Sequence, residues 1–235
     1  MLNFFDYFYQ KKIIRFLKKK NVNKIDNLID VGAHKGETIK LFLSNFIVKK
    51  IISFEASPQN FSILNKNLNF FKKKFKYTDI STENIGLGAQ NKSVIFKQFS
   101  ESSSSTISKI NENSKYYKKK FKILNFFGHK KSFNEIKINI QRLEDYLKKK
   151  DIHSIDFLKI DTEGYEYEIL IGLGKMINNT KFIMFEHHYD NMILKNYTFR
   201  DINNFLIKNN FLKIYKSKMP FRKTFEYIYT RDLRN

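Results

Sequence analysis

The chain has 235 residues, 42% of them hydrophobic, and it contains no cysteine. This length predicts one domain with a full hydrophobic core, made of residues 25–235, with residues 1–24 as an N-terminal helical appendage. The lack of cysteine excludes disulfides, thiolate metal sites and cysteine nucleophiles. No run approaches the roughly 18 consecutive apolar residues of a membrane span, and no signal-peptide pattern is present, so we expect a cytoplasmic protein.

The formal net charge of +21 would ordinarily indicate a nucleic-acid partner. However, only six of the 44 basic residues are arginine, whose forked guanidinium recognises bases and phosphates better than lysine does. The lysines gather in short runs at residues 18–20, 72–74, 118–120 and 148–150. We therefore interpret the charge as a solvated surface and do not expect nucleic acid. A non-catalytic basic module that binds an anionic polymer stays an alternative.

Residues 2–20 have the pattern of an amphipathic helix, with Tyr9, Ile13 and Phe16 on one side and basic residues elsewhere. Such a helix either covers the sheet of its own domain or makes peripheral contact with a membrane surface. We expect the first arrangement, and membrane contact through residues 2–20 stays the alternative.

From residue 28 onward, strand and helix patterns alternate, which indicates a parallel sheet with helices on both faces. The predicted strands are residues 28–31, 51–54, 82–87, 136–140, 155–160, 182–185, 211–215 and 225–230, and the predicted helices are residues 38–46, 58–70, 142–150, 165–171 and 199–209. Residues 100–135 have no long periodic pattern and are interpreted as a loop insertion. A short loop joins the last two strands, so the final strand should run antiparallel to the rest.

The segment LIDVGAHKGE, residues 28–37, indicates a nucleotide-cofactor site. A buried strand leads into a loop with Gly32 and Gly36, where the backbone can approach a ligand closely, and the next helix adds unpaired N–H donors. About twenty residues later the second strand ends in Glu55, whose carboxylate can accept hydrogen bonds from both hydroxyls of a ribose. Two strand ends are therefore expected to converge on one nucleoside.

Asp30 distinguishes between two kinds of cofactor. A carboxylate at the tip of the first strand would repel a pyrophosphate at the helix N-terminus, which argues against a dinucleotide. S-adenosylmethionine has no phosphate, but it has an ammonium and a sulfonium that a nearby carboxylate favours. We therefore expect S-adenosylmethionine as the cofactor, with an NAD(P)-dependent oxidoreductase as the alternative.

A second cluster of polar residues follows two later strands. Asp161 and Glu163 come after one apolar strand, and Glu186, His187 and His188 come at the end of the next. Ligands of open α/β sheets bind at this edge, so these side chains are expected to face the reactive end of the cofactor. Either histidine could serve as the general base that removes a hydroxyl proton. Alternatively, Asp161 and Glu186 could hold Mg²⁺, which would acidify a bound hydroxyl.

Residues 25–230 resemble the FkbM family of S-adenosylmethionine-dependent methyltransferases. The resemblance is carried by LIDVGAHKGE, SFEAS, ENIGLG at residues 83–88, the serine-rich residues 102–105, RLEDYL and, most specifically, DFLKIDTEGYEYEILIGL at residues 156–173. It implies a Rossmann-like seven-stranded methyltransferase sheet, mostly parallel with an antiparallel last strand. It also implies O-methylation of a hydroxyl on a sugar, a glycan or a secondary metabolite.

By position, the resemblance implies a set of cofactor-binding residues on the glycine loop and the following strand ends. These residues are Asp30, Gly32, Ala33, His34, Gly36, Glu55, Asn84, Ile85 and Asp161. It also implies that Asp161, Glu163 and Glu186 occupy the acidic positions around the active site. His34 stands where related loops often carry asparagine.

Overall fold

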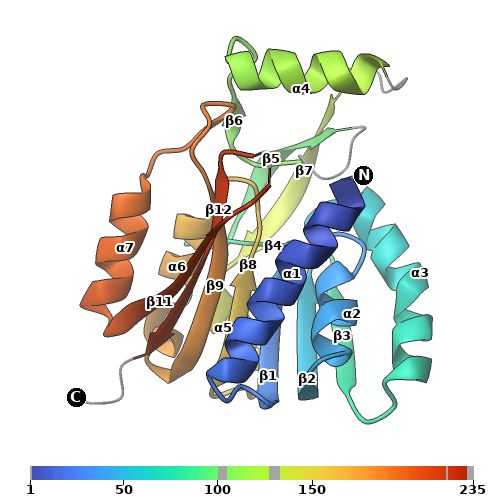
Figure 1. The fold of residues 1–235 in the computed structure, drawn as a ribbon, viewed down its shortest axis with the longest axis vertical. Helices are drawn as coiled ribbons and strands as arrows, with labels where there is room; N and C mark the ends of the chain where they lie inside the picture. The colour runs from blue at the N-terminus through green and yellow to red at the C-terminus, as the bar shows by residue number, and fades with distance from the viewer. Residues whose placement is uncertain (1, 100–104, 127–132, 221, 232–235) are drawn as a thin grey trace.

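The computed structural model describes residues 2–99, 105–126, 133–220 and 222–231. At its centre is a seven-stranded sheet with the strand order β11-β12-β9-β8-β1-β2-β3. These strands are β1 (Lys24–Val31), β2 (Ile47–Phe54), β3 (Asp79–Glu83), β8 (Ile155–Ile160), β9 (Thr180–His188), β11 (Phe211–Lys218) and β12 (Thr224–Arg231). Figure 1 shows this sheet standing upright between two layers of helices.

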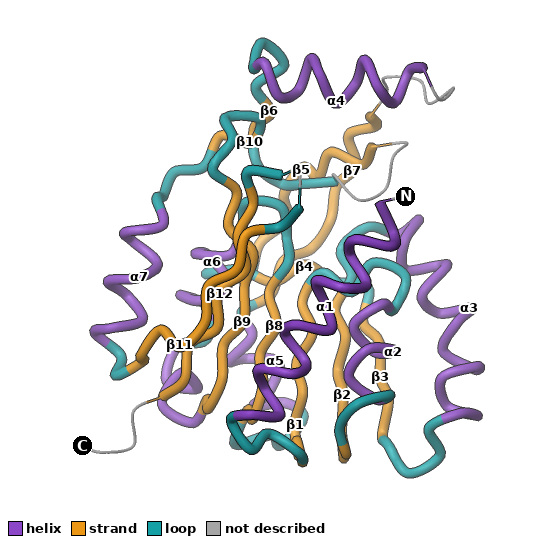
Figure 2. The backbone as a smooth tube through the Cα atoms, viewed as in Figure 1, coloured by secondary structure: helices purple, strands orange, loops and turns teal. Residues whose placement is uncertain are grey.

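The sheet is parallel except at one strand. The strands from β3 through β2, β1 and β8 to β9 pair in parallel, whereas β12 is antiparallel to both β9 and β11. The expected α/β sheet with an antiparallel last strand is thus confirmed. The carboxyl ends of the parallel strands lie along one edge of the sheet, which is the upper edge in Figure 2.

Helices cover both faces of the sheet. One layer contains α1 (Leu2–Lys19), α2 (Glu37–Leu43) and α3 (Pro58–Lys74), and the other contains α5 (Leu143–Lys149), α6 (Glu166–Gly172), the 3-10 helix η2 (Gly174–Asn179) and α7 (Phe199–Lys208). Side chains alternate along each strand and so supply both layers. On β1, for example, Leu28 packs toward the first layer and Ile29 toward the second, and both are fully buried.

Helix α1 packs its apolar side against its own sheet. Tyr9, Ile13 and Leu17 are buried in the same hydrophobic cluster as Leu28 and Ile228. The amino-terminal part of α1 reaches the upper edge of the sheet, close to the carboxyl ends of the strands (Figure 1). Among the described residues, no helix is both long and apolar enough to cross a membrane.

A separate three-stranded sheet corrects two of the predicted strands. It consists of β4 (Gly86–Leu87), β7 (Phe133–Gln141) and β5 (Lys92–Phe99), in that order. The strand predicted at residues 136–140 therefore lies outside the main sheet, and the strand predicted at residues 82–87 is divided between β3 and β4. The alternation in IKINI suits a strand with one solvent-facing side, whereas central parallel strands are continuously apolar, as IDFLKI nearly is.

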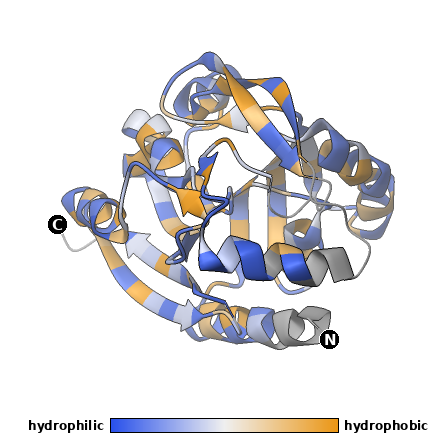
Figure 3. Cartoon of the chain, turned by 90° about the horizontal axis from the view of Figure 1, so that it is seen from above, coloured by the Kyte–Doolittle hydropathy of each residue, from blue (hydrophilic) through white to orange (hydrophobic). Residues whose placement is uncertain are grey.

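The segment at residues 100–135, which the sequence predicts as a loop, contains regular structure. Strand β6 (Lys109–Ile110) pairs with β10 (Ile193–Leu194), and α4 (Lys115–Phe126) is a helix. Figure 3, seen from above, shows α4 crossing the edge of the sheet, with its coloured amino-terminal part largely hydrophilic. Between its lysines, α4 has a short apolar stripe that packs on β5. Residues 100–104 and 127–132 of the segment lie outside the described residues.

Candidate functional site

The loop after β1 is held close to the ends of two neighbouring strands. The N–H groups of Gly32 and Ala33 both donate to the carbonyl oxygen of Phe54, at 2.9 and 3.0 Å. Gly32 has a φ of 81°, and a Cβ on it would lie 1.8 Å from the carbonyl oxygen of Asp161. Only glycine fits there, so the ends of β1, β2 and β8 meet around one point.

Glu55 fixes the position of this loop from the end of β2. Its Oε2 accepts a hydrogen bond from the N–H of His34 and its Oε1 accepts one from the N–H of Ser57, both at 2.8 Å. Burial raises the pKa of Glu55, and these N–H donors oppose that rise. The Asn60 side chain also bonds this carboxylate, and because a carboxylate has about four acceptor positions, Glu55 can still accept a hydrogen bond from a ribose hydroxyl.

Two further residues implied by the sequence lie beside Glu55. The side-chain amide of Asn84 donates to the carbonyl oxygen of Glu55 at 2.8 Å, and Ile85 lines the same cavity. His34 points its Nδ1 toward Glu37 at 3.1 Å and has a left-handed φ of 48°. The structure therefore brings the residues of the predicted nucleoside site together.

Asp30 faces a buried lysine that the sequence reasoning missed. Asp30 and Lys159 are register partners on β1 and β8, and the lysine Nζ lies 3.6 Å from Asp30 Oδ1 and 3.3 Å from Asp161 Oδ2. Burial alone would lower the pKa of Lys159, but these carboxylates together raise it. Burial also raises the pKa of Asp30, while Lys159 lowers it. The sequence does contain a signal for this residue, because Lys159 stands between Leu158 and Ile160 in a buried strand.

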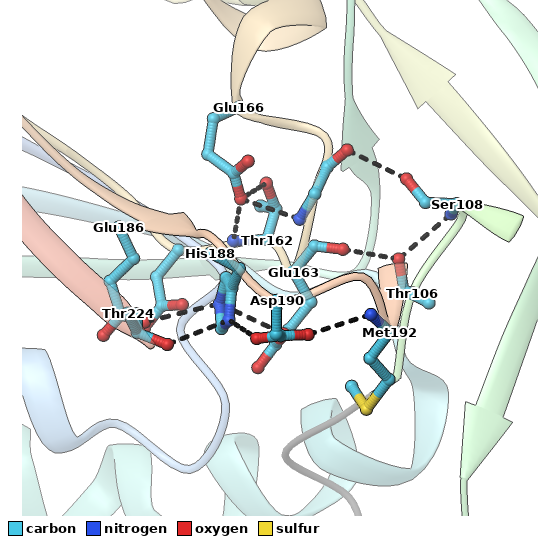
Figure 4. A network of polar contacts seen from close by, with 12 residues as sticks. Thr106, Ser108, Thr162, Glu163, Glu166, Glu186, His188, Asp190, Met192 and Thr224 are labelled. Atoms are coloured by element: carbon cyan, nitrogen blue, oxygen red, sulfur yellow. Dashed lines mark hydrogen bonds and ion pairs between the residues drawn. The ribbon is translucent and has the colours of Figure 1, made fainter. Parts of the chain in front are cut away.

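His188 lies at the centre of a network of acids (Figure 4). Its Nε2 is 3.3 Å from Glu163 Oε2 and 3.7 Å from Glu186 Oε2. Its Nδ1 is 3.1 Å from Thr224 Oγ1 and 3.7 Å from Asp190 Oδ2. Burial alone would lower the pKa of His188, but the acids, Glu163 foremost, raise it to about 10. The ring is therefore an imidazolium at neutral pH.

His187 lies on the opposite face of β9, since successive side chains of a strand point to opposite sides. Its ring packs against aromatic rings, 4.8 Å from Tyr189 and 5.8 Å from Phe199 between centroids. Burial lowers the pKa of His187 to about 3. Of the two histidines proposed from the sequence, only His188 lines the cavity.

The turn after β8 is fixed by a buried glutamate. Glu166 Oε1 accepts hydrogen bonds from the N–H groups of Thr162, at 3.3 Å, and Gly164, at 2.9 Å, and its other oxygen accepts one from the hydroxyl of Tyr197. Within this turn Glu163 has a left-handed φ of 52°. A non-glycine residue in that conformation is strained, and such strain is common at functional sites. The turn aims the Glu163 side chain at His188.

The segment after residue 104 also fixes the turn that follows β8, through two side-chain hydrogen bonds. Thr106 Oγ1 donates to the carbonyl oxygen of Glu163 at 2.7 Å, and Ser108 Oγ donates to that of Gly164 at 2.8 Å. Thr106 is 1% exposed, so its hydroxyl is a buried part of the site. These contacts appear together in Figure 4.

A single cavity of about 2120 Å³ connects these groups. Gly32 and Glu55 line one part of it, and Glu163, Glu186 and His188 line another. The glycine loop and the acid and histidine cluster are therefore parts of one site.

The structure does not support the Mg²⁺ hypothesis. Among the described residues, no three His, Asp or Glu side chains are grouped so as to hold a metal ion. Asp161, one of the two expected ligands, lies beside the Lys159 ammonium, which already supplies a positive charge.

The sequence matches the model of a family described as "Methyltransferase FkbM domain" over residues 30–213. A curated relative, "Methyltransferase 1" of Beauveria bassiana (strain ARSEF 2860), is 20% identical over 147 residues, which are 62% of this chain and 57% of that protein. The chain thus spans less than two thirds of this relative.

Two solved structures share the fold. The FkbM methyltransferase of Methylobacillus flagellatus KT has a TM-score of 0.57 and 14% identity, covering 87% of this chain and 43% of that one. The magnesium protoporphyrin IX methyltransferase of Synechocystis PCC 6803, solved with bound S-adenosylhomocysteine (SAH), has a TM-score of 0.54 and 8% identity, covering 98% and 85%.

We expect Gly32→Ala to lower the free energy of unfolding by about 2–4 kcal/mol, because the new Cβ clashes with the Asp161 carbonyl in a strained conformation. Gly86→Ala is the matched control, since its Cβ would meet its nearest atom at 3.4 Å. Urea unfolding of both variants measures the difference. Equal stability of the two variants would contradict the close approach of β1 and β8.

We expect the acids around His188 to make stability depend on pH. Its folded pKa of about 10 lies above the ordinary 6.5, so its stabilisation is complete below pH 6.5 and is lost as the pH rises through 10. The free energy of unfolding should therefore fall less steeply between pH 8 and 10 in His188→Gln than in the original chain. His153→Gln, at an exposed histidine, should keep the original slope. Parallel curves for all three proteins would refute the imidazolium.

Proposed function

The chain belongs to the FkbM methyltransferase domain family, and we propose that it transfers the methyl group of S-adenosylmethionine to a hydroxyl oxygen of a sugar, glycan or other small-molecule acceptor. The observation that carries this proposal is the shared cavity, in which the glycine loop and Glu55 adjoin the His188 cluster. The family favours this reading over an NAD(P)-dependent oxidoreductase or a non-catalytic basic module.

The residues at the ends of β1 and β2 fit the cofactor. Gly32, Ala33 and His34 line the cavity beside Glu55, whose carboxylate can accept from a ribose hydroxyl. Asp30 is fully buried behind this loop, paired with Lys159, and adds negative charge to this end of the site. Asn84 keeps the Glu55 backbone in place. When bound, S-adenosylmethionine supplies a methyl group that its sulfonium makes electrophilic.

The remaining task of the protein is to align the hydroxyl and accept its proton. An imidazolium has no lone pair for this, so the histidine base suggested by the sequence is replaced in our proposal by the Glu163 carboxylate. His188, 3.3 Å away, forms an ion pair with that carboxylate and orients it. His187 has no part in this mechanism, since it does not line the cavity.

We expect Glu55→Gln to weaken binding of SAH about 10- to 150-fold, the loss of a hydrogen bond to a charged group. Isothermal titration calorimetry of the folded variant measures this loss. Glu135→Gln, at an exposed position on β7, is the control and should bind as the original chain does. Unchanged affinity in Glu55→Gln would remove Glu55 from the ribose role, and no binding of SAH by the original chain would reject the proposed function.

We expect Glu163→Gln to lower kcat about 10²- to 10⁴-fold, the usual contribution of a general base, with SAH affinity unchanged. Tritium transfer from labelled S-adenosylmethionine into a library of hydroxyl acceptors measures the rate. A chelator should leave the rate of the original chain unchanged, because Lys159 rather than a metal ion neutralises the acids. Full activity of Glu163→Gln would rule out Glu163 as the base.

A further inference from the structure

Two buried glutamates face each other on the β9 and β12 strands. Glu186 and Glu226 are register partners in the antiparallel pair, and they are 7% and 6% exposed. Directly opposed side chains in such a pair have Cβ atoms about 4.5–5.5 Å apart, and like charges at that distance destabilise the sheet. Stability alone therefore does not explain this pair.

Glu226 lacks part of the hydrogen bonding that a buried carboxylate needs. Its Oε2 has no hydrogen-bond partner among the described residues, although the atom is buried. The hydroxyl of Tyr9 donates to the carbonyl oxygen of Ser217 at 3.0 Å, and its interaction with Glu226 lowers the pKa of that carboxyl. An unsatisfied buried carboxylate is costly, so each such group needs an explanation.

The positive charges near the pair are already shared with other acids. Lys159 contacts Asp30 and Asp161, and His188 lies 3.3 Å from Glu163 but 3.7 Å from Glu186. Burial raises the pKa of Glu226 to about 7, Lys159 lowers it, and Asp161 raises it further. The carboxylates at this edge thus outnumber the cations that neutralise them.

The glutamate pair is several strands away from the nucleoside site along the edge of the sheet. Glu55 follows β2, and β12 is four strands away from β2, or about 19 Å at the usual strand spacing. Glu186 and Glu226 nevertheless line the same cavity as Glu55. In the proposed function, Glu186 and Glu226 therefore lie in the part of the cavity that receives the acceptor.

We propose that Glu186 and Glu226 bind an ammonium group on the acceptor, so that the substrate is an amine-bearing hydroxyl compound such as an amino sugar. This inference rests on the proposed function and adds the substrate class to it. An ammonium supplies both the missing charge and donors for the unpartnered Oε2. It also orients the acceptor, since the hydroxyl to be methylated lies at a fixed reach from the amine.

The test uses the full chain saturated with SAH and two probes, glucosamine and glucose, titrated by calorimetry at pH 7. We expect glucosamine to bind at least about tenfold more tightly than glucose, and Glu226→Gln to abolish that preference. Glu135→Gln should keep it. Glu226→Gln should also raise the melting temperature of the unliganded chain, because it removes one of two opposed charges, whereas losing a structural ion pair would lower it.

Several outcomes would overturn this inference. Equal binding of the two sugars, binding of neither, or an unchanged preference in Glu226→Gln each removes the ammonium site. A Glu226→Gln variant that binds SAH tenfold more weakly assigns the pair to the cofactor's own ammonium instead. These outcomes leave the proposed function intact if the original chain binds SAH, whereas absence of SAH binding rejects the proposed function itself.

Discussion

The buried ammonium of Lys159 is the interaction on which the carboxyl edge of the sheet depends. It lies on the central strand β8, 9% exposed, between Asp30 and Asp161. An isolated charge in such a place costs several kcal/mol, and only well-placed partners offset that cost. Without Lys159, the acids at the ends of β1, β8 and β9 would repel one another across a cavity of low dielectric constant. The strand that builds the core therefore also carries the charge that keeps these acids together.

The two halves of the site are organised by different kinds of contact. The nucleoside half relies on backbone, because Gly32 brings three strand ends together and two main-chain N–H groups hold Glu55. The other half relies on side chains, which hold Glu163 in a strained turn beside His188. Backbone contacts need only the glycine pattern and a distant acid. Side-chain contacts need residues from β8, β9, β12 and the segment after residue 104 to meet.

This difference explains how much the sequence could predict. The parallel sheet and the Glu55 site follow from short local patterns, and the family motif adds Asp161 and Glu163. The roles of Glu226 and Thr106 depend on the pairing of β12 with β9 and on the bridge between Thr106 and Lys97, neither of which a single sequence reveals. The choice of His188 over His187 follows from which face of β9 points to the cavity, and a shift of one residue would have reversed it. The alternative Mg²⁺ site is not supported, and its weakness was not visible in the sequence because the lysine in IDFLKI was interpreted as part of an apolar strand.

The size of the cavity and the distribution of charge in it give its exposed basic residues and its buried acids different roles toward a ligand. At about 2120 Å³ it exceeds the 300–1,000 Å³ of a typical ligand pocket, so it has room for a cofactor and a sizeable acceptor together. Exposed basic residues of α1 and α4 line the cavity, in keeping with the net charge of +21. Asp161, Glu186 and Glu226 line it as well. Solvent and salt screen the outer charges, whereas the charges of the buried Glu186 and Glu226 are screened much less. Burial also raises the pKa of both carboxyls. In our proposal the few buried acids, rather than the many exposed lysines, therefore decide which group of the acceptor reaches the methyl donor.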